Sequence, residues 1–135
     1  SKLIHKFPIT IYYEDTDAQG VVYYANYLRY FERARTEYLR EIGYGQKKLM
    51  QEGVIFIVRK VNLEFMKPAT LDDEIIIETE LIKLGKVSFD FAQVVLCKGN
   101  LICESIIKCG SVETNDFKPK PLPKYLYNGM KTLLS

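Results

Sequence analysis

The sequence has no tryptophan and only one histidine, His5, among its 135 residues. Its three cysteines are an odd number, and no pair of them forms a CxxC motif. Since clusters of histidine and cysteine are what a zinc site or a disulfide framework requires, neither is expected. We expect reduced thiols at Cys97, Cys103 and Cys109, no bound metal and no separate cofactor.

Long apolar segments and a strong charge of one sign are also missing. The longest unbroken apolar run is Val54 to Val58, far below the roughly 20 residues that span a membrane. No N-terminal stretch has the pattern of a signal peptide. The net charge is only +2 and the basic residues are scattered, so nothing favours a nucleic-acid partner. We expect a cytoplasmic protein without a transmembrane segment.

The composition that remains is that of a globular protein with an aromatic core. Apolar residues make up 47% and charged residues 27%, and there are 10 tyrosines and 7 phenylalanines. A chain of this length forms one domain with a sizeable core, so residues 1–135 are taken as a single domain.

Hydrophobic periodicity predicts one strand, a long helix, and then four more strands. The apolar positions of the long helix fall on one wide arc: Tyr27, Leu28, Tyr30, Phe31, Ala34, Tyr38, Leu39 and Ile42. The expected strands are 7–13, 54–66, 74–84, 87–97 and 101–113, and short helices are expected at 46–52 and near the C-terminus. This order predicts an α+β fold in which a five-stranded antiparallel sheet, its last four strands in meander order, curls around one helix. The strand 101–113 is apolar on both faces and is expected inside the sheet.

Three carboxylates precede the long helix within four residues: Glu14, Asp15 and Asp17. Gly20 then permits a turn, and the helix begins near Tyr24 or Ala25. The first N–H groups of a helix have no internal partner and carry partial positive charge. The sequence therefore places a carboxylate beside a set of free donors.

That pairing suits hydrolysis of an activated ester such as a thioester. The N–H groups would stabilise the oxyanion, and the carboxylate would act as a nucleophile or activate a water molecule. Asp17 is the better candidate because it is nearer the helix. The alternative stays open, since an aspartate in such a turn is commonly a helix cap or a solvated residue.

Four further side chains near this stretch have two interpretations each. Glu32 and Arg35 are three residues apart on the helix, so they are predicted to form an ion pair, or else to orient the Asp15–Asp17 turn. Tyr12 and Tyr13 are predicted to pack in the core as strand residues, or else to hydrogen-bond the reacting centre.

The stretch YYEDTDAQGVVYYANYLRYFERARTEYL closely resembles the signature of hotdog-fold acyl-CoA thioesterases. It is most similar to the Tol–Pal-associated branch of the 4-hydroxybenzoyl-CoA thioesterase family. FIVRKVNLEFMKPATLDDEI and KPKPLP extend the resemblance over essentially the whole chain.

The resemblance implies an acyl-CoA thioesterase in which a curved five-stranded sheet wraps one long helix. It implies subunits that pair through their sheets, often as homotetramers, with active sites between subunits. The catalytic carboxylate of the motif matches Asp17, and the carbonyl-polarising N–H matches the backbone of Tyr24, with Tyr13 as a further catalytic candidate. Substrate contacts are expected at Gly20, Val21 and Val22. The branch also implies a link to lipid metabolism.

Two features of the resemblance stay open. The branch usually has histidine at the position of Tyr24, which leaves the substrate range and the rate undetermined. Candidate ligands for the phosphates of CoA are Arg59, Lys60, Lys83 and Lys86, which are equally well read as solvated charges.

Two alternative functions follow. One is a module that binds acyl-CoA or an acyl carrier protein with little turnover. The other is a hotdog-fold dehydratase, which is disfavoured because it needs a site histidine and His5 is badly placed.

Overall fold

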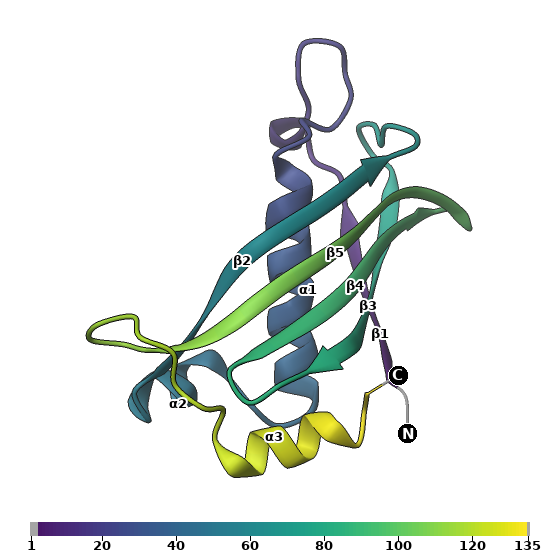
Figure 1. Ribbon diagram of the computed structural model, residues 1–135. Coiled ribbons are helices and arrows are strands. Elements are labelled where there is room, and N and C mark those ends of the chain that lie inside the picture. Colours follow the sequence, from purple (N-terminus) through teal and green to yellow (C-terminus); the bar gives the residue numbers. More distant parts are fainter. Residues whose placement is uncertain (1–2, 135) are drawn as a thin grey trace.

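The computed structural model describes residues 3–134, apart from the side chain of Gln46. Figure 1 shows its five strands and three α-helices. The strands are β1 (Ile4–Thr10), β2 (Val54–Phe65), β3 (Glu74–Leu84), β4 (Ser88–Cys97) and β5 (Asn100–Glu113). The helices are α1 (Asn26–Glu41), α2 (Gln46–Gln51) and α3 (Lys124–Lys131), and a single 3₁₀ turn, η1, covers Tyr13–Asp15. The predicted α+β class and five-stranded antiparallel sheet are confirmed.

The sheet has the strand order β1-β3-β4-β5-β2, so the predicted meander is correct only for its last three strands. β2 pairs with β5, and β3 pairs with β1. The reason is the segment between β2 and β3, which has no tight turn and contains Pro68. This segment is held at the loop before α1, where Val21 bridges Thr70 and the Val22 N–H donates to the Ala69 carbonyl at 2.8 Å. β5 lies inside the sheet, as predicted.

Helix α1 has 16 residues, against 6 in α2 and 8 in α3, and it lies across one face of the sheet (Figure 1). We call this the inner face and the opposite one the outer face. The predicted arc of α1 is buried except for Leu28, which is 43% exposed, and Ile42, which follows the last residue of α1 and is half-buried. Gly43 ends the helix region with a φ of +93°, a conformation that favours glycine.

The core fills the space between α1 and the inner face. Near the start of α1, Tyr27 and Phe31 pack with residues of β3 and β4, including Ile77 and Val95. Near its end, Tyr38 packs on Phe91, with ring centroids 5.2 Å apart. Burying one such aromatic side chain contributes about 1.5–3 kcal/mol, so the aromatic arc anchors α1 and fixes where its N-terminus lies.

The structure also bears on the cysteines and on membrane-spanning segments. The three cysteines are free thiols, and Cys103 and Cys109 are buried on the same face of β5. Over the described part of the chain, no helix is both long and apolar enough to cross a membrane.

Candidate active site

The segment between β1 and α1 forms a loop that stands beyond the N-terminal end of α1 (Figure 1). β1 ends at Thr10 rather than at the predicted residue 13, because the chain turns into the 3₁₀ element η1. The loop then folds back on itself, with Thr16 bridging Val22. At its tip Gly20 has a φ of +79°, so the predicted glycine turn is confirmed.

Asp15 fastens this loop to the helix. Its carbonyl oxygen accepts hydrogen bonds from the Tyr23 N–H at 3.0 Å and from Asn26 Nδ2 at 2.9 Å. Its carboxylate accepts one from the Tyr12 N–H at 2.9 Å. Burial, and then the charge of Asp15, raise the pKa of Tyr30. Asp15 therefore supports the loop, and this leaves Asp17 as the carboxylate available for chemistry.

Asp17 presents one carboxylate oxygen to the loop and keeps the other available. Its Oδ1 accepts hydrogen bonds from the Gln19 N–H at 2.9 Å and from the Val21 N–H at 3.4 Å. Its backbone N–H donates to the Val21 carbonyl at 2.8 Å, which fixes the orientation of the residue. Within residues 3–134, Oδ2 of Asp17 accepts no hydrogen bond. A positioned, half-buried carboxylate with one free oxygen can attack a carbonyl or accept a proton from water.

The N-terminus of α1 provides the donors that the sequence predicted. The N–H groups of Asn26, Tyr27 and Leu28 each donate to the carbonyl three residues before them, and Ala25 gives the helix no side-chain cap. The N–H groups of Tyr24 and Ala25 have no acceptor in the described part of the chain. These two donors lie at the positive end of the helix dipole, where a developing oxyanion would be stabilised.

The side chains around these donors are exposed in the single subunit. Tyr24 is 62% exposed and lies beside Tyr23, with ring centroids 4.9 Å apart. Interaction with Tyr24 is the main cause that raises the pKa of Tyr23. Tyr12 and Tyr13 are 62% and 82% exposed, so the prediction that they pack in the core is wrong. The early end of β1 explains the error, because strand alternation no longer applies to them. These tyrosine side chains, which precede and follow the Asp17 loop in the sequence, are therefore largely open to solvent in the single subunit.

The predicted ion pair between Glu32 and Arg35 is not formed among the described residues. Arg35 Nη1 instead donates to Oε1 of Gln93 on β4 at 2.9 Å. Burial lowers the pKa of Arg35, and the charges of Cys109 and Glu32 partly oppose that effect. Arg35 therefore fastens the middle of α1 to the sheet and does not orient the Asp15–Asp17 turn.

Sequence reasoning missed Gln93, which is fully buried. Its Nε2 donates to the Phe31 carbonyl at 3.0 Å and to Thr79 Oγ1 at 2.9 Å. The sequence did contain an indication of this role. Gln93 alternates with Phe91 and Val95 on one face of the expected strand, and a buried amide there needs a polar partner.

The basic residues predicted to hold phosphates are dispersed. Arg59 and Lys60 lie on β2, and Lys83 lies on β3. Lys86 lies in the β3–β4 turn, at the end of the sheet opposite to the Asp17 loop, since β1 runs antiparallel to β3. One chain therefore does not gather these four residues around Asp17.

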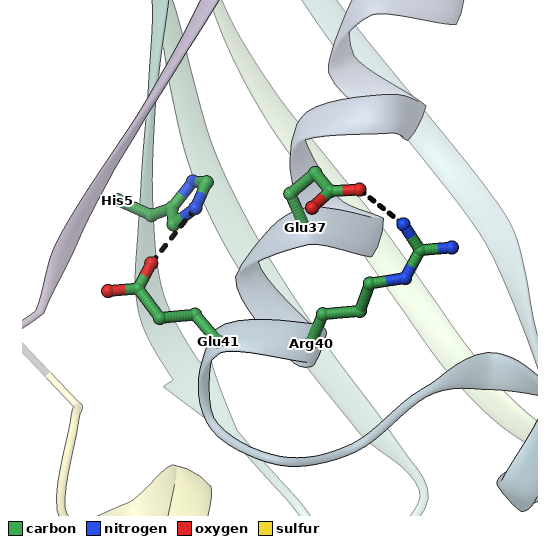
Figure 2. A network of polar contacts seen from close by, with 4 residues as sticks. All are labelled: His5, Glu37, Arg40 and Glu41. Atoms are coloured by element: carbon green, nitrogen blue, oxygen red, sulfur yellow. Dashed lines mark hydrogen bonds and ion pairs between the residues drawn. The ribbon is translucent and has the colours of Figure 1, made fainter.

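His5 lies at the opposite end of α1 from Asp17. Its Nε2 is 3.0 Å from Glu41 Oε2, next to the ion pair of Glu37 and Arg40 in the last turns of the helix (Figure 2). It is buried, at 8% exposure. The histidine on which a dehydratase would depend is thus remote from the loop.

Comparisons with known proteins identify the class that this fold and loop define. A family model described as the thioesterase-like superfamily matches residues 12–129. The acyl-CoA thioester hydrolase YbgC of Escherichia coli is 43% identical over 122 residues, which cover 90% of this chain and 91% of YbgC. The acyl-CoA thioesterase YbgC of Haemophilus influenzae is 39% identical over 119 residues, covering 87% and 88%.

A solved structure agrees at the level of the fold. The DHNA-CoA thioesterase of Staphylococcus aureus superposes with a TM-score of 0.92, over 96% of this chain and 90% of that chain. At 22% identity this likeness concerns the hotdog-type architecture alone. The chain belongs to the thioesterase-like superfamily. Its enzyme class is that of the thioester hydrolases.

Proposed function

We propose that the chain is an acyl-CoA thioesterase that releases a free acid and CoA, with Asp17 as the reacting carboxylate. Two observations carry this proposal: Asp17 Oδ2 accepts no hydrogen bond within residues 3–134, and the N–H groups of Tyr24 and Ala25 at the start of α1 have no acceptor there. The names of the 39–43% identical relatives support acyl-CoA as the substrate. The reaction uses no separate cofactor, since CoA is part of the substrate.

This arrangement is compatible with two mechanisms of thioester hydrolysis, which have the same overall reaction. In the first, Asp17 accepts a proton from water while the water oxygen attacks the carbonyl carbon. In the second, Asp17 itself attacks and forms a mixed anhydride that water then hydrolyses. In both, the carbon–sulfur bond breaks, a carbon–oxygen bond from water remains in the acid, and the CoA thiolate takes up the proton. The N–H groups of Tyr24 and Ala25 stabilise the oxyanion.

Family resemblance supports the following roles for the other parts of the site. α1 takes the role of the central helix of a hotdog fold, and Gly20, Val21 and Val22 line the path of the acyl group. The exposed Tyr12, Tyr13 and Tyr24 favour a site closed by a second subunit, as in the dimers or tetramers of the Tol–Pal-associated branch. Arg59, Lys60 and Lys86 remain candidates for the phosphates of CoA, with contributions from two subunits. The compartment is the cytosol.

Replacing Asp17 by asparagine tests the proposal. Asparagine keeps an oxygen for the Gln19 and Val21 N–H groups but removes the base and nucleophile. We expect kcat for thiol release from acyl-CoA to fall at least about 100-fold, with binding retained. The matched control is Asp15→Asn, which preserves an acceptor for the Tyr12 N–H and should change kcat less than about tenfold. Wild-type turnover by Asp17→Asn on every substrate of an acyl-CoA panel would refute the role.

A second function is a binding module for acyl-CoA or an acyl carrier protein. The tyrosine at position 24, where the branch usually has histidine, favours it. Calorimetric binding of acyl-CoA without thiol release, over chain lengths from acetyl to palmitoyl and over benzoyl, would support the module. Turnover on any of them that depends on Asp17 would exclude it.

A further inference from the structure

The hydroxyl of Tyr27 joins the start of α1 to the segment between β2 and β3. Tyr27 is the second residue of α1, and its Oη accepts a hydrogen bond from the Ala69 N–H at 3.2 Å. Both residues are buried, at 2% and 0% exposure. Water therefore cannot replace this acceptor, and a buried N–H without a partner is costly. The hydroxyl thus fixes where Ala69 lies relative to the helix.

The ring of Tyr27 is held in the core by other aromatic side chains. It packs edge-on against Tyr30, with ring centroids 5.9 Å apart, and its centroid lies 5.6 Å from that of Phe65 at the end of β2. Burial raises the pKa of Tyr27, so the hydroxyl remains uncharged at neutral pH. The Tyr27 N–H donates to the Tyr24 carbonyl at 3.3 Å. Tyr27 therefore belongs to the same turn as the proposed oxyanion donors.

Ala69 and its neighbour Thr70 hold the loop that carries Asp17. The Ala69 carbonyl accepts a hydrogen bond from the Val22 N–H at 2.8 Å, and Thr70 forms a β-bridge with Val21. The Val21 carbonyl accepts a hydrogen bond from the Asp17 N–H at 2.8 Å. Asp17 Oδ1 in turn accepts one from the Val21 N–H at 3.4 Å. A continuous series of contacts therefore connects the segment between β2 and β3 with the Asp17 carboxylate.

The same segment is also fastened at a point that does not involve Tyr27. The Thr70 N–H and hydroxyl both donate to Asp73 Oδ2, at 2.8 and 3.0 Å. The Ile11 N–H donates to the Asp73 carbonyl at 2.9 Å. Without the Tyr27 hydroxyl, the segment should therefore stay on the sheet and shift only at Ala69.

We infer that Tyr27 is a positioning residue, whose hydroxyl sets where Asp17 lies relative to the N–H groups of Tyr24 and Ala25. The inference rests on the function proposed above, which gives those groups their roles. Tyr27 joins the two halves of the site, because its backbone shares the turn of the donors and its hydroxyl holds the segment that anchors Asp17. It does not contact the reacting atoms. A displacement of reacting groups by about 1 Å can cost about 100-fold in rate, so a partial shift has a measurable effect.

Tyr27→Phe tests this role, since it keeps the ring and removes the hydroxyl. We expect kcat for thiol release from acyl-CoA to fall about tenfold with KM within about twofold of the wild type, because the placement of the reacting groups changes and substrate binding does not. The matched control is Tyr38→Phe, also buried on α1, whose hydroxyl has no partner within residues 3–134. It should leave both constants unchanged. A Tyr27→Phe variant with the kcat of this control would overturn the inference, as would an effect on KM alone.

The double variant with Asp17→Asn separates positioning from a general loss of structure. In that background the carboxylate no longer reacts, so adding Tyr27→Phe should change the residual kcat less than about twofold. A further fall of about tenfold would overturn the inference, because the effect of the hydroxyl would then be independent of Asp17. Failure of the proposed function is distinguished from this result, since it would appear as wild-type turnover by Asp17→Asn alone.

Amide hydrogen exchange provides a readout that does not depend on activity. In Tyr27→Phe the Val22 N–H should exchange at least about tenfold faster than in the wild type, since its acceptor Ala69 is held less firmly. The Ile42 N–H at the other end of α1, which donates to the Tyr38 carbonyl at 3.3 Å, should keep its wild-type rate. Equal acceleration of both amides would indicate global destabilisation, and an unchanged rate at Val22 would show no coupling to the loop. Either result would contradict the role of Tyr27.

Discussion

The Asp15 carbonyl oxygen and Asn26 Nδ2 are 2.9 Å apart, and this hydrogen bond joins the carboxylate loop to the first residue of α1. The Tyr23 N–H donates to the same oxygen at 3.0 Å. Loop and helix N-terminus are therefore joined by contacts of Asp15, so the position of Asp17 relative to the N–H groups of Tyr24 and Ala25 depends on a residue that does not itself react.

Asn26→Ala should loosen that unit. Loss of one side-chain hydrogen bond costs about 1 kcal/mol, which lowers the melting temperature by about 3–5 °C for a domain of this size. We expect kcat to fall as well, because the loop no longer holds Asp17 in register with the donors. The control is Asn128→Ala on α3, which should leave both quantities unchanged. Equal melting temperatures for Asn26→Ala and the wild type would show that the contact contributes nothing.

Tyr24→Phe should retain kcat within about threefold, since the proposed carbonyl contact is a backbone N–H that the substitution leaves in place. Tyr24→His restores the residue usual in the branch and should change the substrate range more than the fold. Steady-state kinetics over the same acyl-CoA panel measure both effects. A 100-fold loss in Tyr24→Phe would assign the chemistry to the phenol instead of the backbone.

Gln93→Met should lower the free energy of unfolding by roughly 2–3 kcal/mol, because it leaves the buried guanidinium of Arg35 and the Phe31 carbonyl without this partner. Urea denaturation at neutral pH measures the change. Gln51→Met, at the exposed end of α2, serves as the control and should stay within about 0.5 kcal/mol of the wild type. A Gln93 variant as stable as that control would mean that Arg35 finds another acceptor.

Stability should fall at alkaline pH partly through Tyr38. Burial raises the pKa of Tyr38 to about 12, above the value near 10 in an unfolded chain. The folded state therefore retains the proton that the unfolded state loses, so this contribution is full below about pH 10 and is lost as the pH rises through 12. Its hydroxyl has no partner in the described chain. Tyr38→Phe should thus lose less stability between pH 8 and 11 than the wild type does, whereas exposed Tyr12→Phe should match it.

Local patterns in the sequence predicted the strands from 74 on, the buried arc of α1 and the glycine turn before it, because periodicity and turn chemistry act over a few residues. They did not predict that β2 pairs with β5. That pairing depends on how the segment with Pro68 attaches to the Asp17 loop, a contact between residues about 50 positions apart. The same limit applies to Arg35, whose partner on β4 is 58 residues away.

The sequence by itself determined which residue types stand before the helix: two aspartates and a glycine. That the N-terminus of α1 has no side-chain cap is shown only by the structure. Only the tertiary structure decided which aspartate is occupied and which is available. Asp15 is occupied because Asn26 Nδ2 and the Tyr23 and Tyr12 N–H groups converge on it, whereas only Oδ1 of Asp17 accepts hydrogen bonds within residues 3–134.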